Sequence, residues 1–220
     1  MRLGTVYRYE LLSRFGLFKL VRPEHRVLDI GGYDGFILST LDCRERVLVD
    51  PDARKDYPGV NYVRDDFLGY EFSSGDFDFI FTFDVIEHIP DGEETEFAQR
   101  IARLLKPGGT CYLTAPSRDI RVFPWFLTGW VSRKWGHDKC PGFTRAELGR
   151  FISPSGLGCV FTELNAPSYR FWYLFLRALQ PALPRRLTHR LLGRVAAFDA
   201  VHHRGTRGYF LLALTRPQAG

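Results

Sequence analysis

The sequence predicts an α/β fold, built on an open, mostly parallel, doubly wound sheet. Three observations lead to this prediction. Short apolar runs alternate with helix-like segments between residues 26 and 116. A glycine-rich turn follows the first apolar run. The second apolar run ends in a carboxylate, about twenty residues after that turn, as in nucleotide-binding sheets.

The first strand and its turn are the most informative segment. Residues 27–30 form a short apolar run that predicts a buried strand. Gly31, Gly32 and Gly35 follow at once, and glycines let the backbone turn sharply and approach a ligand without a Cβ in the way. Residues 36–41 then predict a helix whose N-terminal amides face that ligand. Together these segments predict the first unit of a nucleotide-type site.

The remaining elements follow in order along the chain. The second strand, residues 46–50, ends at Asp50, placed to accept hydrogen bonds from two ribose hydroxyls. Later strands are expected at residues 60–63, 77–82, 110–115, 158–164 and 208–214, and a helix at residues 93–105. We expect one domain over residues 1–220: an N-terminal helix within 1–22, a core at 26–116, insertions at 117–143 and 167–205, and a last strand within 207–215.

Five segments resemble the class I S-adenosylmethionine-dependent methyltransferases: VLDIGGYDG, VLVDPD, RDDFL, FDFIFTFDVIEHIPD and LLKPGGTCYLTAPS. The resemblance covers roughly residues 26 to 165 in order. It implies a Rossmann-like sheet of about seven strands, the last one antiparallel, with a helical insertion between strands six and seven. It also implies S-adenosyl-L-methionine as the cofactor.

The resemblance further implies which residues hold this cofactor. Asp29 and the glycine turn lie beside its methionine part, Asp50 holds the ribose, and Asp66 reaches the adenine amino group. The backbone of two residues after the fourth strand lines the other side. The implied cofactor-binding residues are Asp29, Gly31, Gly32, Gly35, Asp50, Pro51, Asp66, Phe67, Thr82 and Phe83.

Tyr33 departs from the family pattern, which usually reads G-x-G-x-G at this turn. The middle glycine is replaced by the tyrosine, and Gly32 is a candidate to supply the flexibility instead. A changed backbone path at Tyr33 would weaken or abolish cofactor binding. Two outcomes therefore stay open: a working cofactor site, or a methyltransferase fold that has lost catalysis and serves as a binding module.

Two aromatic insertions are expected to form the walls of the acceptor site. Trp125, Trp130 and Trp135 follow the fifth strand and Trp172 follows the sixth, where ligands of open α/β sheets bind. A base is needed if the acceptor carries a proton, and histidine titrates near neutrality. His137 and His88 are therefore the candidate catalytic bases. Residues 136–148 are also similar to a stretch of small bacterial methyltransferases, some of which act in glycan pathways.

Charge is distributed unevenly. Residues 165–220 hold nine arginines, no lysine and one acid, a net +8, which leaves −3 for residues 1–164 of the total +5. Such asymmetry indicates an anionic partner. As a helix, residues 185–203 would place Leu187, Leu191, Val195 and Phe198 opposite Arg186, Arg190 and Arg194. The segment 168–207 would then contact an anionic membrane peripherally, or cover the sheet as a lid.

The composition narrows the remaining choices. Cys43, Cys111, Cys140 and Cys159 show no metal-ligand spacing, so we expect a reducing cytoplasm and no metal site. No apolar run reaches the length of a membrane span, and peripheral contact would be at the inner face of the membrane. Phe83-Asp84-Val85-Ile86 stands where base-modifying enzymes carry an Asn-Pro-Pro-Tyr-type motif, so no nucleic-acid acceptor is expected.

Three functions remain, in order of preference. The first is methyl transfer to a hydroxyl or carboxyl of a small hydrophobic, glycan or lipid-linked acceptor. The second is the inactive binding protein described above. The third is a nicotinamide-dependent dehydrogenase, ranked last because the turn lacks the G-x-G-x-x-G spacing.

Overall fold

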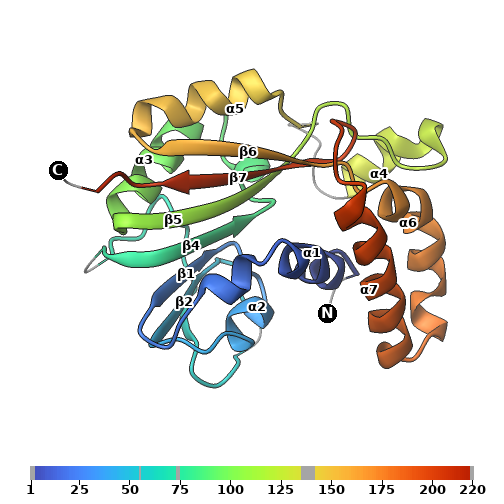
Figure 1. The fold of residues 1–220 in the computed structure, drawn as a ribbon, viewed down its shortest axis with the longest axis horizontal. Coiled ribbons are helices and arrows are strands. Elements are labelled where there is room, and N and C mark those ends of the chain that lie inside the picture. The colour runs from blue at the N-terminus through green and yellow to red at the C-terminus, as the bar shows by residue number, and fades with distance from the viewer. Residues whose placement is uncertain (1–2, 55, 73–74, 135–141, 219–220) are drawn as a thin grey trace. The chain divides into compact units, whose positions relative to one another are not determined.

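The computed structural model describes residues 3–54, 56–72, 75–134 and 142–218 (Figure 1). The chain divides into two compact units. The helical unit comprises residues 1–20, 116–142 and 162–210, and the core unit comprises residues 21–115, 143–161 and 211–220.

The strands form one sheet in the order β3-β2-β1-β4-β5-β7-β6. Their bounds are β1 Arg26–Ile30, β2 Glu45–Val49, β3 Asn61–Val63, β4 Phe77–Phe83, β5 Leu105–Pro116, β6 Gly158–Leu164 and β7 Tyr209–Thr215. Strands β1 to β5 pair in parallel. β7 runs antiparallel to β5, because Arg216 bonds to Gly109 at one end and Ser117 bonds to Gly208 at the other. The prediction of a seven-stranded sheet with an antiparallel last strand is confirmed.

The sheet positions the site through its order. From β1 the chain moves outward to β2 and β3, and it then returns to β4 on the other side of β1. This reversal is a topological switch point, and ligands bind in the crevice beyond the carboxyl ends of the two strands there. Val27, Leu28, Leu48, Ile80 and Phe81 are fully or almost fully buried, as expected for strands of a parallel sheet covered on both faces.

The helices of the core unit are α2 Phe36–Ser39, α3 Glu94–Leu104 and α5 Arg145–Ile152. α5 begins with a capping box: the Thr144 side chain accepts from the Glu147 backbone, and the Glu147 side chain accepts from the Thr144 backbone. Two boundaries differ from expectation. α2 is shorter than predicted, and β5 already begins at Leu105, with a shift in its pairing to β4 between Phe77 and Phe79.

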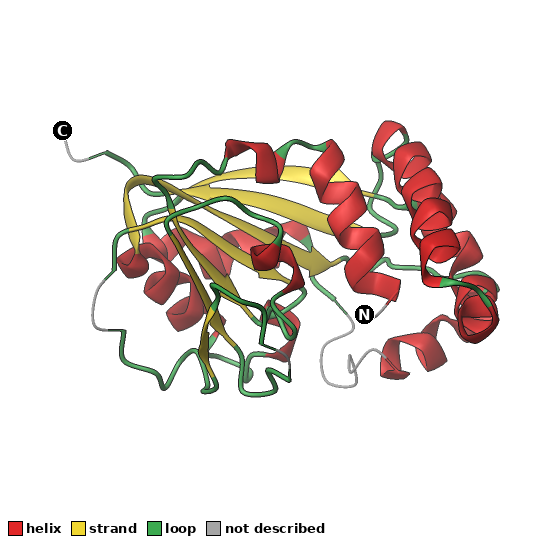
Figure 2. Ribbon diagram, turned by 90° about the horizontal axis from the view of Figure 1, so that it is seen from below, coloured by secondary structure: helices red, strands yellow, loops and turns green. Residues whose placement is uncertain are grey.

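The helical unit contains α1 Leu3–Arg14, α4 Thr128–Lys134, α6 Pro167–Leu179 and α7 Arg185–Val201, with a 3-10 turn at Trp125–Leu127. α6 and α7 lie side by side, as Figures 1 and 2 show, and α1 packs on α7. The predicted helical insertion between the sixth and seventh strands is therefore confirmed as α6 and α7.

Asp199 is the buried centre of the helical unit. Its carboxylate accepts a hydrogen bond from the Tyr7 hydroxyl at 2.7 Å and from the backbone N–H groups of Ser168 and Tyr169 at 2.7 and 2.9 Å. The Tyr7 and Tyr169 rings stack, with centroids 3.8 Å apart. Ala166, the residue before α6, has no side-chain oxygen to cap the helix, so Asp199 satisfies those N–H groups from α7.

The face of α7 that packs is not the one on which Leu187, Leu191, Val195 and Phe198 recur. The buried side chains are Leu192, Ala196 and Asp199, whereas Leu187 is 42% and Phe198 is 52% exposed. The helical period itself was correct. The buried face includes a carboxylate that an apolar pattern does not contain, and the hydrogen bonds of Asp199 satisfy it there.

Candidate functional site

Three positions of the turn after β1, Gly31, Gly32 and Gly35, leave no room for a side chain. Gly31 has φ +71°, and a Cβ there would lie 2.4 Å from Cγ2 of Val85. A Cβ on Gly32 would lie 2.2 Å from Oδ2 of Asp29, a side chain buried in β1. A Cβ on Gly35 would meet the Tyr62 hydroxyl at 2.6 Å. Asp29 and the three glycines are therefore packed into one tight turn at the switch point.

Tyr33 adopts the left-handed conformation, with φ +54°. This is the region that glycine enters freely and that costs other residues roughly 1–2 kcal/mol. The family pattern has a glycine at this position, and Tyr33 adopts a backbone conformation that suits glycine. Its ring lies 5.9 Å from the guanidinium of Arg54, a cation–π contact.

Asp50 joins the turn to the end of β2. Oδ2 accepts the Tyr33 N–H at 2.8 Å, and Oδ1 accepts the Asp52 N–H at 2.7 Å. An ionised carboxylate offers about four acceptor sites, so each oxygen can still accept another donor. The carboxylate is buried and held in place at the carboxyl edge of the sheet.

Tyr62 is a supporting residue that the sequence did not reveal. From β3 its hydroxyl accepts the Tyr57 N–H at 2.9 Å and donates to the Asp34 carbonyl at 3.3 Å. Burial, the largest influence, raises the pKa of this hydroxyl. A tyrosine in an alternating strand gives no sequence signal of such a role, because the contact depends on a turn 28 residues earlier.

The third group of predicted residues lies after β3 and β2. Asp66 is exposed, and its Oδ1 accepts the N–H groups of Leu68 and Gly69 at 2.7 and 3.2 Å. Phe67 is buried against Phe97, with ring centroids 5.2 Å apart. Pro51 is exposed beside Asp50. Oδ1 of Asp66 thus orders its own loop.

The end of β4 forms the other side of the crevice. Thr82 and Phe83 are buried, and among the described residues the Thr82 hydroxyl has no hydrogen-bond partner. The next residue, Asp84, has φ +55° and accepts a hydrogen bond from the Thr114 hydroxyl at 2.7 Å. Its N–H donates back to the Thr114 carbonyl at 3.1 Å. Asp84 is thus fixed to the end of β5, a second left-handed residue at the same sheet edge.

Of the two candidate bases, only His88 lies among the described residues. His88 ends the short 3-10 turn Ile86–His88, is exposed, and donates its backbone N–H to the Val85 carbonyl at 2.8 Å. His137 lies outside the described residues, as do Trp135 and Cys140. The catalytic assignment of either histidine stays a prediction.

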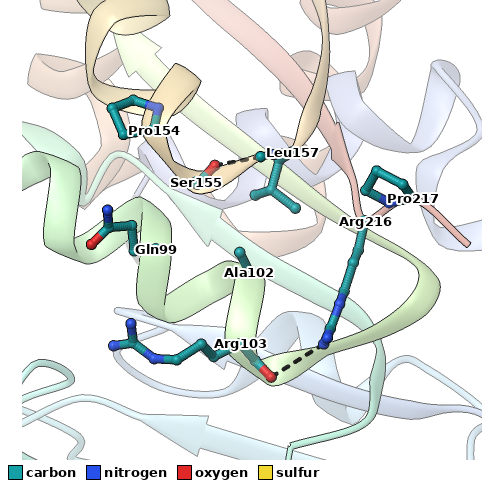
Figure 3. A pocket seen from close by; sticks show the side chains of 9 residues that line it. Gln99, Ala102, Arg103, Pro154, Ser155, Leu157, Arg216 and Pro217 are labelled. Carbon is teal, nitrogen blue, oxygen red and sulfur yellow. Dashed lines mark hydrogen bonds between the residues drawn. The ribbon is translucent and has the colours of Figure 1, made fainter. Parts of the chain in front are cut away.

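Two open pockets of the core unit lie away from these residues. One of about 600 Å³ is bounded by α3, the turn Ser153–Ser155 and the end of β7, where Arg216 points toward the Arg103 carbonyl (Figure 3). The other, of about 490 Å³, is lined by His25, Arg44 and Asp78 near the starts of β1, β2 and β4. Neither contains a predicted cofactor residue, and both open near the amino ends of parallel strands.

Comparisons with known proteins identify the family and the fold. A family model described as a methyltransferase domain matches residues 6–165. Over 124 residues the chain is 33% identical to phosphoethanolamine N-methyltransferase 2 of Caenorhabditis elegans. That match covers 48% of this chain, and the chain spans only 26% of the length of that relative.

Solved structures share the fold at low sequence identity. Phosphoethanolamine N-methyltransferase 2 of Haemonchus contortus, in complex with S-adenosyl-L-methionine, superposes with a TM-score of 0.63 and 19% identity, covering 94% of this chain and 51% of that one. The cyclopropane synthase MmaA2 of Mycobacterium tuberculosis gives 0.59 and 15%, covering 93% and 83%. With the family match extending over most of its length, the chain belongs to the methyltransferase domain family, with the fold of class I methyltransferases that use S-adenosylmethionine.

Proposed function

We propose that the protein transfers a methyl group from S-adenosylmethionine to a small acceptor that is hydrophobic, part of a glycan or linked to a lipid. The observation that carries this proposal is the glycine turn. Tyr33 keeps the left-handed conformation there, and its N–H is held by Asp50. This conformation supports a turn that can hold the cofactor despite Tyr33.

The residues at the switch point suit the parts of this cofactor. The turn of Gly31, Gly32 and Gly35 lets the backbone approach closely, and Asp50 keeps acceptor capacity for two ribose hydroxyls. Asp29, Pro51, Asp66, Phe67, Thr82 and Phe83 complete the proposed set. When bound, S-adenosylmethionine supplies a methyl group on a positively charged sulfur. That sulfur leaves readily, because it becomes a neutral thioether.

The chain's own residues then have two tasks. They align the acceptor for an in-line displacement and keep water out, and they take a proton where the acceptor carries one. His137 is the proposed base, with His88 as the second choice. A hydroxyl or carboxyl is the proposed acceptor group. The nematode relatives, named for N-methylation of phosphoethanolamine, make an amine the competing possibility.

We also propose that the segment 168–207 brings the protein to an anionic membrane, where a lipid-linked acceptor would be found. No described helix combines the length and apolar character needed to cross a bilayer. The contact would therefore be peripheral. Its support is the cluster of arginines in this segment, including the exposed Arg177, Arg186, Arg190 and Arg194.

The alternative is a methyltransferase fold that binds ligands without catalysis. It is favoured by Tyr33, whose ring stands where the family pattern has no side chain, and by the basic C-terminal segment. It predicts that neither S-adenosylmethionine nor its demethylated product, S-adenosylhomocysteine, binds.

Isothermal titration with S-adenosylmethionine and with S-adenosylhomocysteine tests the proposal. We expect micromolar binding of both, and Asp50→Ala should weaken it by about 1–3 kcal/mol through the loss of charge-assisted hydrogen bonds. Asp42→Ala is the matched control, because Asp42 is an exposed acid of the same unit outside the predicted site. Unchanged affinity in Asp50→Ala would show that the ribose assignment is wrong.

Turnover needs a separate measurement. Transfer of a labelled methyl group from S-adenosylmethionine would be followed with lipid-linked, glycan and amine acceptors in parallel. Failure of both cofactor forms to bind would leave the non-catalytic alternative as the better explanation.

A further inference from the structure

The helical unit exposes a continuous row of aromatic rings. Trp125 contacts Phe123 with centroids 5.3 Å apart, and Phe123 stacks on Phe171 at 4.5 Å. Phe171 contacts Trp172 at 5.1 Å, which in turn contacts Phe175 at 5.7 Å. All five rings are exposed, Trp125 and Phe175 by more than half. We call these five residues the aromatic surface.

The aromatic surface is formed by two segments that are hydrogen-bonded to each other, residues 123–125 and α6. The Phe123 N–H donates to the Arg170 carbonyl at 3.0 Å, which fixes the first insertion to α6. Arg170 itself is only 5% exposed and donates to the carbonyls of Asn165 and Arg121 and to the Asn165 side chain. Its burial lowers the pKa of the guanidinium. Although Arg170 lies within the segment 168–207, it is buried and holds the two segments together.

α6 is aromatic on both of its sides, and only one side is used for packing. Tyr169, Tyr173 and Leu176 are buried, whereas Phe171, Trp172 and Phe175 point outward with Leu179. An exposed apolar area of this kind is unusual on a monomer and commonly marks an interaction site. Phe126, which is 85% exposed, and Trp130 lie beside Trp125 in sequence and extend the same character.

The charge of the helical unit indicates what the aromatic surface contacts. Its three stretches hold 17 Lys and Arg against 5 Asp and Glu, a net +12, so the core unit carries −7. Lys134 lies 6.0 Å from the Trp130 ring. On α7, the exposed Arg190 and Arg194 share one face with the exposed Phe198 and Val201. Cations and apolar groups are therefore mixed on the same exposed faces.

We propose that the aromatic surface inserts into the interfacial layer of an anionic membrane, with the arginines and lysines of the helical unit on the lipid headgroups. Aromatic rings are favoured at that layer, and cations near an anionic surface each add to the attraction. The proposal deepens the membrane contact of the proposed function and rests on it. It moves the point of insertion from the segment 168–207 alone to a surface that also includes Phe123 and Trp125.

A second copy of the chain is the competing occupant of an apolar surface. Charge opposes it, because pairing two helical units face to face would bring +12 against +12. An anionic lipid surface complements both the apolar and the cationic features at once. A nucleic acid would match the charge, but its phosphates leave the apolar area of Leu179 and Phe175 unsatisfied.

The test uses the full chain and vesicles of phosphatidylcholine with and without phosphatidylglycerol. We expect sedimentation with the mixed vesicles, weaker binding at high salt, and quenching of tryptophan fluorescence by brominated lipid. Trp172→Ala with Phe175→Ala should weaken vesicle binding by about tenfold or more, since insertion into the membrane would bury a large apolar area of each ring. Val160→Ala is the control, because Val160 is 67% exposed and belongs to the core unit.

A second variant tests the charges separately. Arg186→Gln with Arg190→Gln and Arg194→Gln should weaken binding and reduce its salt dependence, while tryptophan quenching persists in the fraction that still binds. Every variant is also titrated with S-adenosylmethionine, so that loss of membrane binding can be distinguished from loss of cofactor binding. A protein that binds the cofactor but no vesicle overturns the membrane proposal alone.

Two further results would overturn the proposal. The first is dimerisation that depends on Trp172 and Phe175, seen by sedimentation velocity. The second is binding to duplex DNA or RNA that competes with binding to the mixed vesicles and is equally weakened by the aromatic substitutions. Unchanged vesicle binding in the double aromatic variant, with a normal thermal unfolding curve, would also contradict it.

Discussion

The two units of this chain use aromatic residues and charge in opposite ways. In the core unit Phe77, Phe81 and Phe97 are fully buried and the net charge is −7. In the helical unit Phe171, Trp172 and Phe175 face outward and the net charge is +12. A rich aromatic content therefore says little by itself. Its meaning depends on whether the rings share a face with the residues that pack.

The buried carboxylates make the same contrast. In the core unit, Asp78 accepts the Arg26 N–H at 2.8 Å and pairs with Lys106. Burial alone would raise the pKa of Asp78, but these partners lower it below its usual value. In the helical unit, burial raises the pKa of Asp199 despite its three hydrogen bonds. Asp78 is thus paired with a cation, whereas the hydrogen bonds of Asp199 come from neutral donors.

The largest expected effect is that of Asp199→Ala. It leaves the Tyr7 hydroxyl and two backbone N–H groups at the start of α6 without an acceptor, at a cost of about 3 kcal/mol in the free energy of unfolding. Hydrogen exchange should rise in α1, α6 and α7 and stay unchanged in β1, β2 and β4. Asp119→Ala, at an exposed acid of the same unit, is the control. Equal loss of protection in both units would mean that they unfold together.

Tyr33→Gly should act in the opposite direction and within the core unit. It relieves the left-handed strain, offset in part by the greater freedom of glycine in the unfolded chain, and should raise the free energy of unfolding by up to about 1 kcal/mol. Tyr33→Ala is the matched control, because it removes the ring but keeps the Cβ. Urea unfolding gives both values. If the glycine variant is no more stable than the alanine variant, the strain is absent.

The smallest expected effect is a difference in pH dependence between the two carboxylates. Since the folded pKa of Asp78 is lowered, its stabilisation is present above the unfolded pKa of about 4 and is lost as the pH falls further. Since the folded pKa of Asp199 is raised, stability falls as the pH rises from about 4 until the folded carboxyl also ionises. Urea unfolding of Asp78→Asn and Asp199→Asn across this range should show opposite changes in slope. Slopes of the same sign would refute the assignment.

Much of the core unit could be predicted from sequence, because its signals are local. The apolar runs of β1 and β4, the turn at Gly31 and the capping box at Thr144 each depend on residues that are near one another in the chain. The side of α7 that packs could not be predicted. It is set by a hydrogen bond from Tyr7, which no local pattern contains.

The site shows the same division. Asp50 was predicted from its spacing after the turn, and the structure brings it to the Tyr33 N–H. The conformation of Tyr33 could not be read from its identity, since tyrosine rarely adopts a positive φ. Tyr62 and Thr114 were missed for a related reason: each supports a residue about thirty positions earlier.

The hydrogen bond between Tyr7 and Asp199 joins residues 192 positions apart. During synthesis the buried hydroxyl of Tyr7 therefore cannot find its acceptor until the residues up to Asp199 have been made. Contacts of such long sequence separation form slowly, and the unit that depends on them is completed after segments held by local pairing. The helical unit would thus be completed after the core unit.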